Sequence, residues 1–137
     1  MELIDTHCHL DLDAFSTDRQ SVIKRARNAG VKSFIVPAVT ADRWQQLISF
    51  AEQYPFIHFA LGLHPCFIDR HSENDLEELE QLLDQEHVVA IGEIGLDYYA
   101  KDFNKDRQHF YFEAQVNMAN KYALPVIVHA RKSHDDI

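Results

Sequence analysis

Two histidines separated by one residue, His7 and His9, lie at the end of the first apolar segment. Residues i and i+2 of an extended strand point to the same face, so both imidazoles can bind one cation while Cys8 points to the opposite face. Asp5 shares their parity and could hydrogen-bond a histidine ligand. The spacing suggests part of a metal site, although an H-x-H pattern by itself is weak evidence.

Further side chains of the same chemical kinds follow three later apolar segments. His64 follows one of them, Glu93 lies at the end of the next, and His129 and Arg131 close the last. A carboxylate can bridge two cations through its two oxygens. Three imidazoles and one carboxylate suit Zn²⁺, Mn²⁺, Ni²⁺ or Fe²⁺, whereas Mg²⁺ prefers more oxygen ligands. Each residue alone has an ordinary structural explanation, and only their shared placement favours a metal site.

The elements that must position these residues alternate between short apolar segments and helical patterns. We expect strands at residues 3–9, 33–39, 57–63, 88–94 and 125–129. We expect helices at residues 18–29, 41–53, 73–86 and 106–122. Gly30 is placed to end the first helix, and Ser72 to cap the third. In the last helix, the residues expected to face inward are Phe110, Ala114, Met118 and Ala119.

This alternation predicts an α/β fold with a parallel sheet that is buried on both faces. In a parallel barrel, chemistry lies at the carboxyl ends of the strands, where four of the five expected strands carry metal-binding or charged groups. A complete (β/α)8 barrel needs about 250 residues, and this sequence has 137. We therefore expect one domain over residues 1–137, either a small open sheet or the N-terminal part, about five strands, of a TIM (β/α)8 barrel.

The composition limits the classes of protein that this sequence can encode. Hydrophobic residues make up 46% of it, as in ordinary globular proteins, and no apolar run is long enough to span a membrane. The acidic N-terminus does not resemble a secretory signal, so we expect a cytoplasmic protein. We expect Cys8 and Cys66 to be small buried thiols. The net charge of −9 opposes non-specific binding to nucleic acid unless basic residues gather locally.

Five of the nine histidines lack the placement at a strand end that favours a metal site. We interpret these five as surface or helix-end histidines. They are His58, His71, His87, His109 and His134.

Four motifs in the same order resemble those of the TatD-type metal-dependent hydrolases. They are IDTHCHL at 4–10, ALGLHP at 60–65, IGEIGLD at 91–97 and PVIVHAR at 125–131. The continuation RKSHD at 131–135 resembles the YjjV-like branch of this family. The resemblance runs from the first residues to the last. It implies a TIM barrel with a divalent-metal site that hydrolyses phosphodiesters, typically as a deoxyribonuclease.

The resemblance also implies a role for each matched residue. His7 and His9 would hold one metal ion, Glu93 would bridge to a second, and His129 would bind that second ion. The two divalent ions, Zn, Mn, Mg or Ni, would activate a water molecule. The substrate would be a nucleic-acid end or a small phosphodiester.

Three residues would act around the two metal ions in such an enzyme. His64 and Arg131 would contact the scissile phosphate or the metal-bound water, and Asp97 would either support a metal ligand from behind or fix a neighbouring loop. The family pattern continues with a metal-binding histidine on the sixth strand and an aspartate on the eighth, and this sequence contains neither. We expect the N-terminal half of such an enzyme, with open sheet edges that favour self-association or leave the fold marginally stable. The 137 residues alone could be inactive.

Three other interpretations compete with a phosphodiesterase. Amidohydrolase-type and deaminase barrels also use H-x-H, but they usually place a carbamylated lysine where this sequence has Glu93. PHP-type phosphoesterases also begin with H-x-H, but the Gly92–Gly95 element does not fit them. A non-catalytic metal-binding remnant also stays open, because part of the family's ligand set is missing. The number of metal ions bound would distinguish this remnant from an intact site with two metals.

Overall fold

The computed structural model describes residues 1–84, 87–99 and 102–137. Over these residues it contains one sheet of parallel strands, each hydrogen-bonded to the next in sequence order. The strands are β1 (Leu3–Asp5), β2 (Val31–Pro37), β3 (Ile57–Leu61), β4 (Val88–Asp97) and β5 (Val126–Arg131). The predicted α/β fold with a parallel sheet is therefore confirmed.

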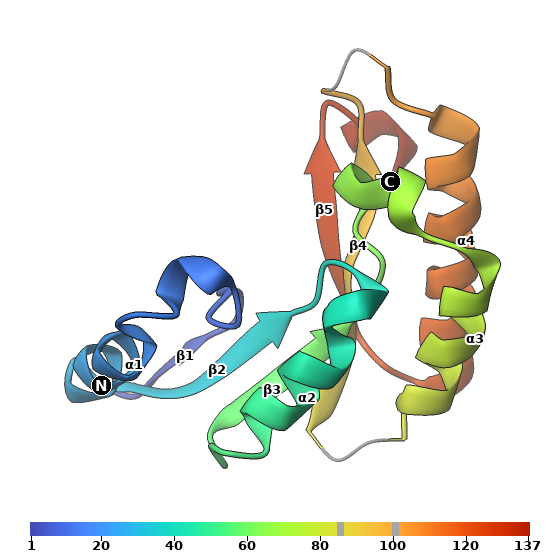
Figure 1. Cartoon of the computed structure of the whole chain (residues 1–137). Helices are drawn as coiled ribbons and strands as arrows, with labels where there is room; N and C mark the ends of the chain where they lie inside the picture. The colour runs from blue at the N-terminus through green and yellow to red at the C-terminus, as the bar shows by residue number, and fades with distance from the viewer. Residues whose placement is uncertain (85–86, 100–101) are drawn as a thin grey trace.

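A helix lies between each pair of neighbouring strands in the chain. The helices are α1 (Arg19–Asn28), α2 (Trp44–Ala51), α3 (Glu73–Leu82) and α4 (Lys105–Tyr122). Short 3-10 turns also occur, including η3 (Pro65–Arg70) directly after β3. In Figure 1, α3 and α4 lie beside each other along β4, α2 accompanies β3, and α1 lies near β2.

The strand order explains why this sheet is half of a barrel. Right-handed crossovers that always advance in one direction place every helix on the same face of the sheet. A doubly wound sheet would instead reverse its strand order at a switch point. Here the order β1-β2-β3-β4-β5 has no reversal, so the helices cover one face and the other face is left for a barrel interior.

Local sequence signals set several of the helix ends. Ser72 caps α3 in a capping box, and its backbone N–H donates to Asp75 Oδ2 at 2.7 Å. Gly30, just beyond α1, has a φ of 109°, which glycine adopts readily. Both predicted caps are confirmed. Helix α3 ends at Leu82, and the predicted end at residue 86 lies outside the described residues.

The predicted strand ends are wrong by up to four residues. Strand β1 ends at Asp5 instead of residue 9, while β4 continues to Asp97 instead of stopping at residue 94. Strand β2 lies two residues before the predicted range, and β3 ends at Leu61 instead of 63. Apolar runs do not reveal where pairing with a neighbouring strand stops, because residues just past a strand end can stay buried, as Ala38 does after β2 and Leu63 after β3.

The core lies between the helices and the sheet, and its largest fully buried side chains include Trp44, Phe59 and Tyr111. The predicted inward face of α4 is partly wrong. Phe110 is 47% exposed, whereas Ala119 is buried as expected. Helix α4 instead turns Gln108 and Gln115 toward the sheet, because both side chains bond to the backbone that follows β3 or ends β4.

The two edge strands expose apolar side chains. Leu3 and Ile4 on β1, and Val126 and Val128 on β5, each have at least 38% of their surface accessible. Edge strands with free backbone groups and exposed apolar side chains readily pair with further strands. Among the helices in the described ranges, none combines the length and the apolar character needed to cross a bilayer.

Candidate metal centre

The carboxylate of Glu93 on β4 lies at the centre of four imidazoles. Its Oε2 is 3.1 Å from His7 Nε2 and 3.4 Å from His9 Nε2. Its Oε1 is 3.1 Å from His129 Nδ1 and 3.5 Å from His64 Nε2. The structure thus brings together side chains from the loops after β1 and β3 and from within β4 and β5, and each carboxylate oxygen faces one pair of histidines.

The histidines keep Glu93 ionised although its side chain is nearly buried. Burial alone would raise the pKa of the carboxyl. Hydrogen bonds from His64 and His9, together with the attraction of His64 and His7, outweigh burial and hold that pKa well below its usual range. The hydrogen bond to Glu93 also raises the pKa of His9. The site therefore contains an ionised carboxylate, which favours the binding of a divalent cation.

His7 and His9 reach Glu93 from the loop after β1, not from within the strand as predicted. Asp5 accepts a hydrogen bond from the backbone N–H of His7 at 3.2 Å, so it fixes the start of this loop and not an imidazole ring. His9 Nδ1 donates to the Pro37 carbonyl at 3.1 Å, which turns Nε2 toward Glu93. Cys8 packs against the core, with its Sγ 3.9 Å from the Ile35 carbonyl oxygen.

A buried histidine supports the backbone of His64. His71 Nε2 donates to the His64 carbonyl at 2.9 Å, and only 3% of the surface of His71 is exposed. Burial lowers the pKa of His71. His71 directly follows η3 and so lies at a helix end, one of the two places predicted for it, but it is buried and does not lie at the surface. The sequence offered no clear signal that His71 is buried, because it precedes Ser72, the N-cap of α3, where exposed residues are common.

Asp97, at the end of β4, fixes the second nitrogen of His129. His129 Nε2 lies 2.8 Å from Asp97 Oδ2, while Asp97 Oδ1 accepts from the Tyr99 N–H at 2.9 Å. Burial would raise the pKa of Asp97, but hydrogen bonds from Cys66, Tyr99 and His129 lower it overall. Asp97 thus fixes the start of the loop after β4 and also orients a candidate metal ligand.

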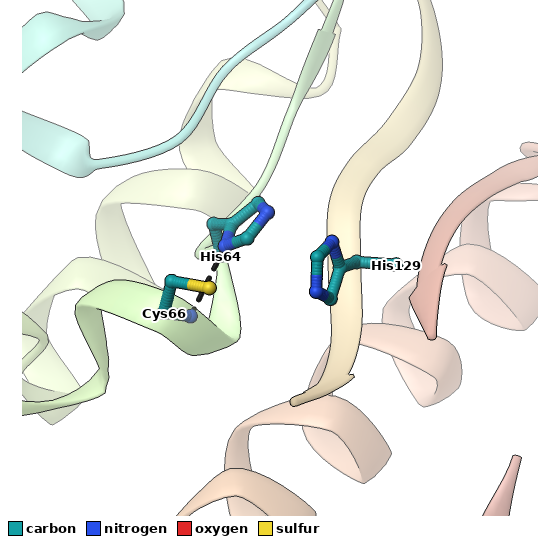
Figure 2. Close-up of side chains that lie close together, drawn as sticks. All are labelled: His64, Cys66 and His129. Atoms are coloured by element: carbon teal, nitrogen blue, oxygen red, sulfur yellow. Dashed lines mark hydrogen bonds between the residues drawn. The ribbon is translucent and has the colours of Figure 1, made fainter. Parts of the chain in front are cut away.

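The expectation that Cys66 is a buried thiol is wrong. The residue is exposed, two positions after His64, and its Sγ donates to Asp97 Oδ2 at 3.1 Å. Desolvation of the sulfur and the Asp97 carboxylate raise the pKa of this thiol to about 12. Figure 2 shows Cys66 facing His64 and His129 across the end of the sheet. The sequence signal for a place near the site was that Cys66 directly follows His64 and Pro65.

Arg131 lies at the rim of the site, beside an exposed aromatic ring. Its guanidinium carbon is 3.5 Å from the centre of the Tyr99 ring, and the ammonium of Lys132 is 4.8 Å from the same centre. The predicted site residue Arg131 thus contacts the ring of Tyr99, whereas the predicted histidines contact the carboxylate of Glu93.

Two groups of side chains in the described ranges have the spacing of metal ligands. One consists of His7, His9 and Glu93, and its ligand atoms lie within 4.8 Å of one another. The other consists of His64, Cys66 and His129, with the same spacing. Imidazole, carboxylate and thiolate suit a borderline cation such as Zn²⁺, so the residues present fit a divalent metal.

The family model described as TatD related DNase matches residues 4–137. The chain belongs to this family. The match confirms the resemblance on which the residue roles were predicted, and it covers all four motifs.

Relatives from several bacteria share this sequence over nearly its whole length. The chain is 43% identical over 136 residues to "Uncharacterized metal-dependent hydrolase YjjV" of Escherichia coli, covering 98% of this chain and 52% of that protein. It is 36% identical to "Uncharacterized metal-dependent hydrolase YabD" of Bacillus subtilis, covering 98% and 53%. It is 35% identical to "3'-5' ssDNA/RNA exonuclease TatD" of a Pantoea strain, covering 97% and 52%. The chain thus spans about half the length of these curated relatives.

A solved structure shows the same relationship in three dimensions. The crystal structure of YjjV, a TatD homologue from Escherichia coli, matches 97% of this chain with a TM-score of 0.92 and 44% sequence identity. The match covers 52% of the YjjV chain. Of the two expected folds, part of a TIM barrel is therefore the correct one.

Proposed function

We propose that this chain supplies the metal-binding half of a divalent-metal-dependent phosphodiesterase that acts like a deoxyribonuclease. The observation that carries the proposal is the position of Glu93, whose two oxygens each face a separate pair of histidines. A carboxylate that joins two ligand sets is the arrangement needed to bridge two cations. The names of the relatives, which include metal-dependent hydrolases and a 3'-5' ssDNA/RNA exonuclease, agree with this reaction class.

In this proposal the residues hold two ions, with Zn²⁺, Mn²⁺, Ni²⁺ or Mg²⁺ as candidates. His7 and His9 would bind one ion, His129 the other, and Glu93 both. Two bound cations would supply an activated water molecule and neutralise charge on the phosphoryl oxygens. The low pKa of Glu93 keeps the bridging ligand ionised at neutral pH. The Pro37 carbonyl and Asp97 orient the rings of His9 and His129, respectively.

The remaining residues of the site would contact the substrate. His64 Nε2 faces Glu93 Oε1 at 3.5 Å, where it can donate a hydrogen bond to a phosphoryl oxygen next to the metals. Arg131 and Lys132 gather positive charge at the rim of a chain whose net charge is −9. Tyr99, which is 54% exposed, offers a ring on which a base can stack. Local cations beside an aromatic ring favour a nucleic-acid end as the substrate.

The exposed edges fit self-association. We propose that the apolar side chains on β1 and β5 are covered by a second copy of the chain. Sedimentation velocity should then show a dimer at micromolar concentration. A monomer that stays folded at all concentrations would overturn this part of the proposal.

Metal stoichiometry is the sharpest test of the proposed function. Equilibrium dialysis with Zn²⁺ or Mn²⁺ should find two ions per chain, and Glu93→Gln should lose their coupled binding. His58→Ala is the matched control, because His58 lies at the start of β3, next to His87, and makes no part of the cluster. A chain that binds one ion weakly, or none, would favour the non-catalytic remnant.

Activity is the second arm of this test. An end-labelled single-stranded oligonucleotide is incubated with the chain and Mn²⁺ or Mg²⁺, with a chelator control. Cleavage that requires metal and is lost in Glu93→Gln would support the proposal. Two bound ions without cleavage would leave a metal-binding half-site and overturn the assignment of catalysis to these 137 residues alone.

A further inference from the structure

We propose that Phe67 is a second surface for stacking a nucleobase, on the opposite side of His64 from Tyr99. This inference rests on the proposed function and narrows it. It makes the substrate a single-stranded nucleic acid that spans the metal centre, with one base against Phe67 and another against Tyr99. A base in a duplex already stacks on its neighbours and would have to leave them, so two such surfaces favour single strands.

The ring of Phe67 lies against the imidazole that faces the phosphoryl group in the proposed function. The ring centres of His64 and Phe67 are 5.9 Å apart, and their planes meet at 67°. The backbone N–H of Phe67 donates to the His64 carbonyl at 3.0 Å, which holds the two residues together at the start of η3. Since one sugar joins a nucleobase to its phosphate, a phosphate at His64 places a base within reach of Phe67.

The ring of Phe67 is exposed although the chain on both sides of it is anchored in the interior. Pro65 and Ile68 are buried, whereas 37% of the surface of Phe67 is accessible. The backbone leaves the helical conformation at Phe67, with φ −113° and ψ 24°, so η3 is kinked there. A single exposed apolar side chain is ordinary on a protein surface. The contact with His64 is what distinguishes this one.

The neighbours of the two aromatic rings place Phe67 and Tyr99 on opposite sides of His64. The guanidinium carbon of Arg70 is 5.8 Å from the centre of the Phe67 ring, and Arg70 forms an ion pair at 2.8 Å with Asp42, in the turn after β2. Tyr99 instead follows β4 and lies against the end of β5. Because the strand order is β2-β3-β4-β5, the segment after β3 that carries His64 lies between these contacts.

The two surfaces differ in charge. Asp42 neutralises Arg70 beside Phe67, whereas Arg131 and Lys132 both lie beside the Tyr99 ring. Stacking on an uncharged ring releases no counterion, so the contribution of Phe67 to affinity should not depend on salt. One stacked base strengthens binding roughly 5- to 150-fold. Phe67 should therefore add affinity of this size through stacking alone.

A scan of abasic sites tests the contact between one side chain and one base. Short single-stranded oligonucleotides that lack one base at successive positions are bound to the Glu93→Gln chain, and fluorescence anisotropy measures each affinity. Removal of the base that stacks on Phe67 should weaken binding roughly 5- to 150-fold. Phe67→Ala should abolish this penalty at that position, and Tyr99→Ala should abolish the penalty at a different position.

Further variants separate stacking from folding. Phe67→Trp should keep the affinity and the positional penalty, whereas Phe67→Leu, which is apolar but not aromatic, should lose both. Phe110→Ala is the matched control, because Phe110 is 47% exposed on α4 and packs against Tyr111, and it should bind as tightly as the parent chain. For Phe67→Ala, the plot of log affinity against log salt concentration should run parallel to that of the parent, because no charge is removed.

Several outcomes would overturn the second stacking surface. Penalties that are unchanged in Phe67→Ala, or kept in Phe67→Leu, would do so. Loss of the penalty at one and the same position in Phe67→Ala and Tyr99→Ala would reduce the two surfaces to one. In each of these cases the strand still binds, so the proposed function stands. A wild-type chain that binds two metal ions but no oligonucleotide would overturn the stacking surface and leave the metal centre, whereas one that binds neither would overturn both proposals.

Discussion

Gln115 on α4 forms two hydrogen bonds with the backbone of Leu63, the residue that precedes His64. Its Oε1 accepts from the Leu63 N–H at 2.7 Å, and its Nε2 lies 3.4 Å from the Leu63 carbonyl. Gln108, two turns earlier on the same helix, makes the same pair of bonds with Asp97 at 2.7 and 2.9 Å. One face of α4 therefore fixes the backbone at Leu63 and at Asp97. These two points adjoin the side chains of His64 and Asp97, which both lie against His129.

Gln115→Leu should destabilise the chain by about 1–3 kcal/mol, because it leaves the buried N–H of Leu63 without a partner. Urea unfolding measures this change. Asn117→Ala, at an exposed position of the same helix, is the control and should stay within about 0.5 kcal/mol of the wild type. Equal stabilities of the two variants would show that the Gln115 side chain does not hold Leu63.

Stability should fall as the pH drops below the ordinary histidine pKa of 6.5, in part because of His71. Burial lowers the pKa of His71 in the folded chain, so the unfolded chain binds the proton more readily. The contribution is complete above pH 6.5 and is lost below it, with a slope of at most about 1.4 kcal/mol per pH unit. His71→Gln, which keeps a donor for the His64 carbonyl, should therefore show a flatter profile between pH 7 and pH 5. Parallel profiles would contradict this prediction.

Gly95→Ala should destabilise the chain by about 3 kcal/mol. Gly95 has a φ of 138°, which a side chain rarely adopts, and an added Cβ would collide with the backbone carbonyl of His129 on β5. The variant should also lose affinity for metal, since His129 must move. Thermal unfolding and metal titration measure the two effects. Lys32→Ala, at an exposed position of β2, serves as the control, and a stable Gly95→Ala with normal metal binding would refute the argument.

Ala123→Gly should stabilise the chain by about 1 kcal/mol. Ala123 ends α4 in the left-handed conformation, with φ 53° and ψ 38°, where a Cβ is unfavourable. Ala29→Gly is a matched control at the end of α1, where φ is −78°. This control should lose about 0.5–1 kcal/mol, because glycine only adds freedom to the unfolded chain. The same sign of change in both variants would contradict the prediction.

Tyr99→Ala and Arg131→Ala should each weaken binding of single-stranded DNA, by roughly 1–3 kcal/mol for the lost base stacking at Tyr99. The two side chains stack on each other at the rim, so their effects should be less than additive. Fluorescence anisotropy with a labelled oligonucleotide, in the Glu93→Gln background, measures binding without cleavage. Arg25→Ala on α1 is the control for a loss of charge alone. An equal loss in that control would assign the effect to net charge and not to the rim.

The order of the strands and helices could be predicted from the sequence, and so could the clustering of His7, His9, His64, Glu93 and His129. The physical reason is periodicity. Parallel βα units place every strand's carboxyl end at one edge of the sheet, so residues in or just after the carboxyl-terminal halves of successive strands must lie near one another. The motifs also indicated the family correctly, although the exact strand ends were wrong.

Which polar residues are buried, and which backbone groups they bond to, could not be predicted before the chain was folded. Gln108 and Gln115 look like solvated helix residues in the sequence, and Phe110 looks like core, yet the rotation of α4 reverses their places. The burial of His71, whose imidazole donates to the His64 carbonyl, was missed for the same reason. Whether a polar side chain is buried depends on backbone groups that remain unpaired after a strand ends, and those groups exist only once the sheet has formed.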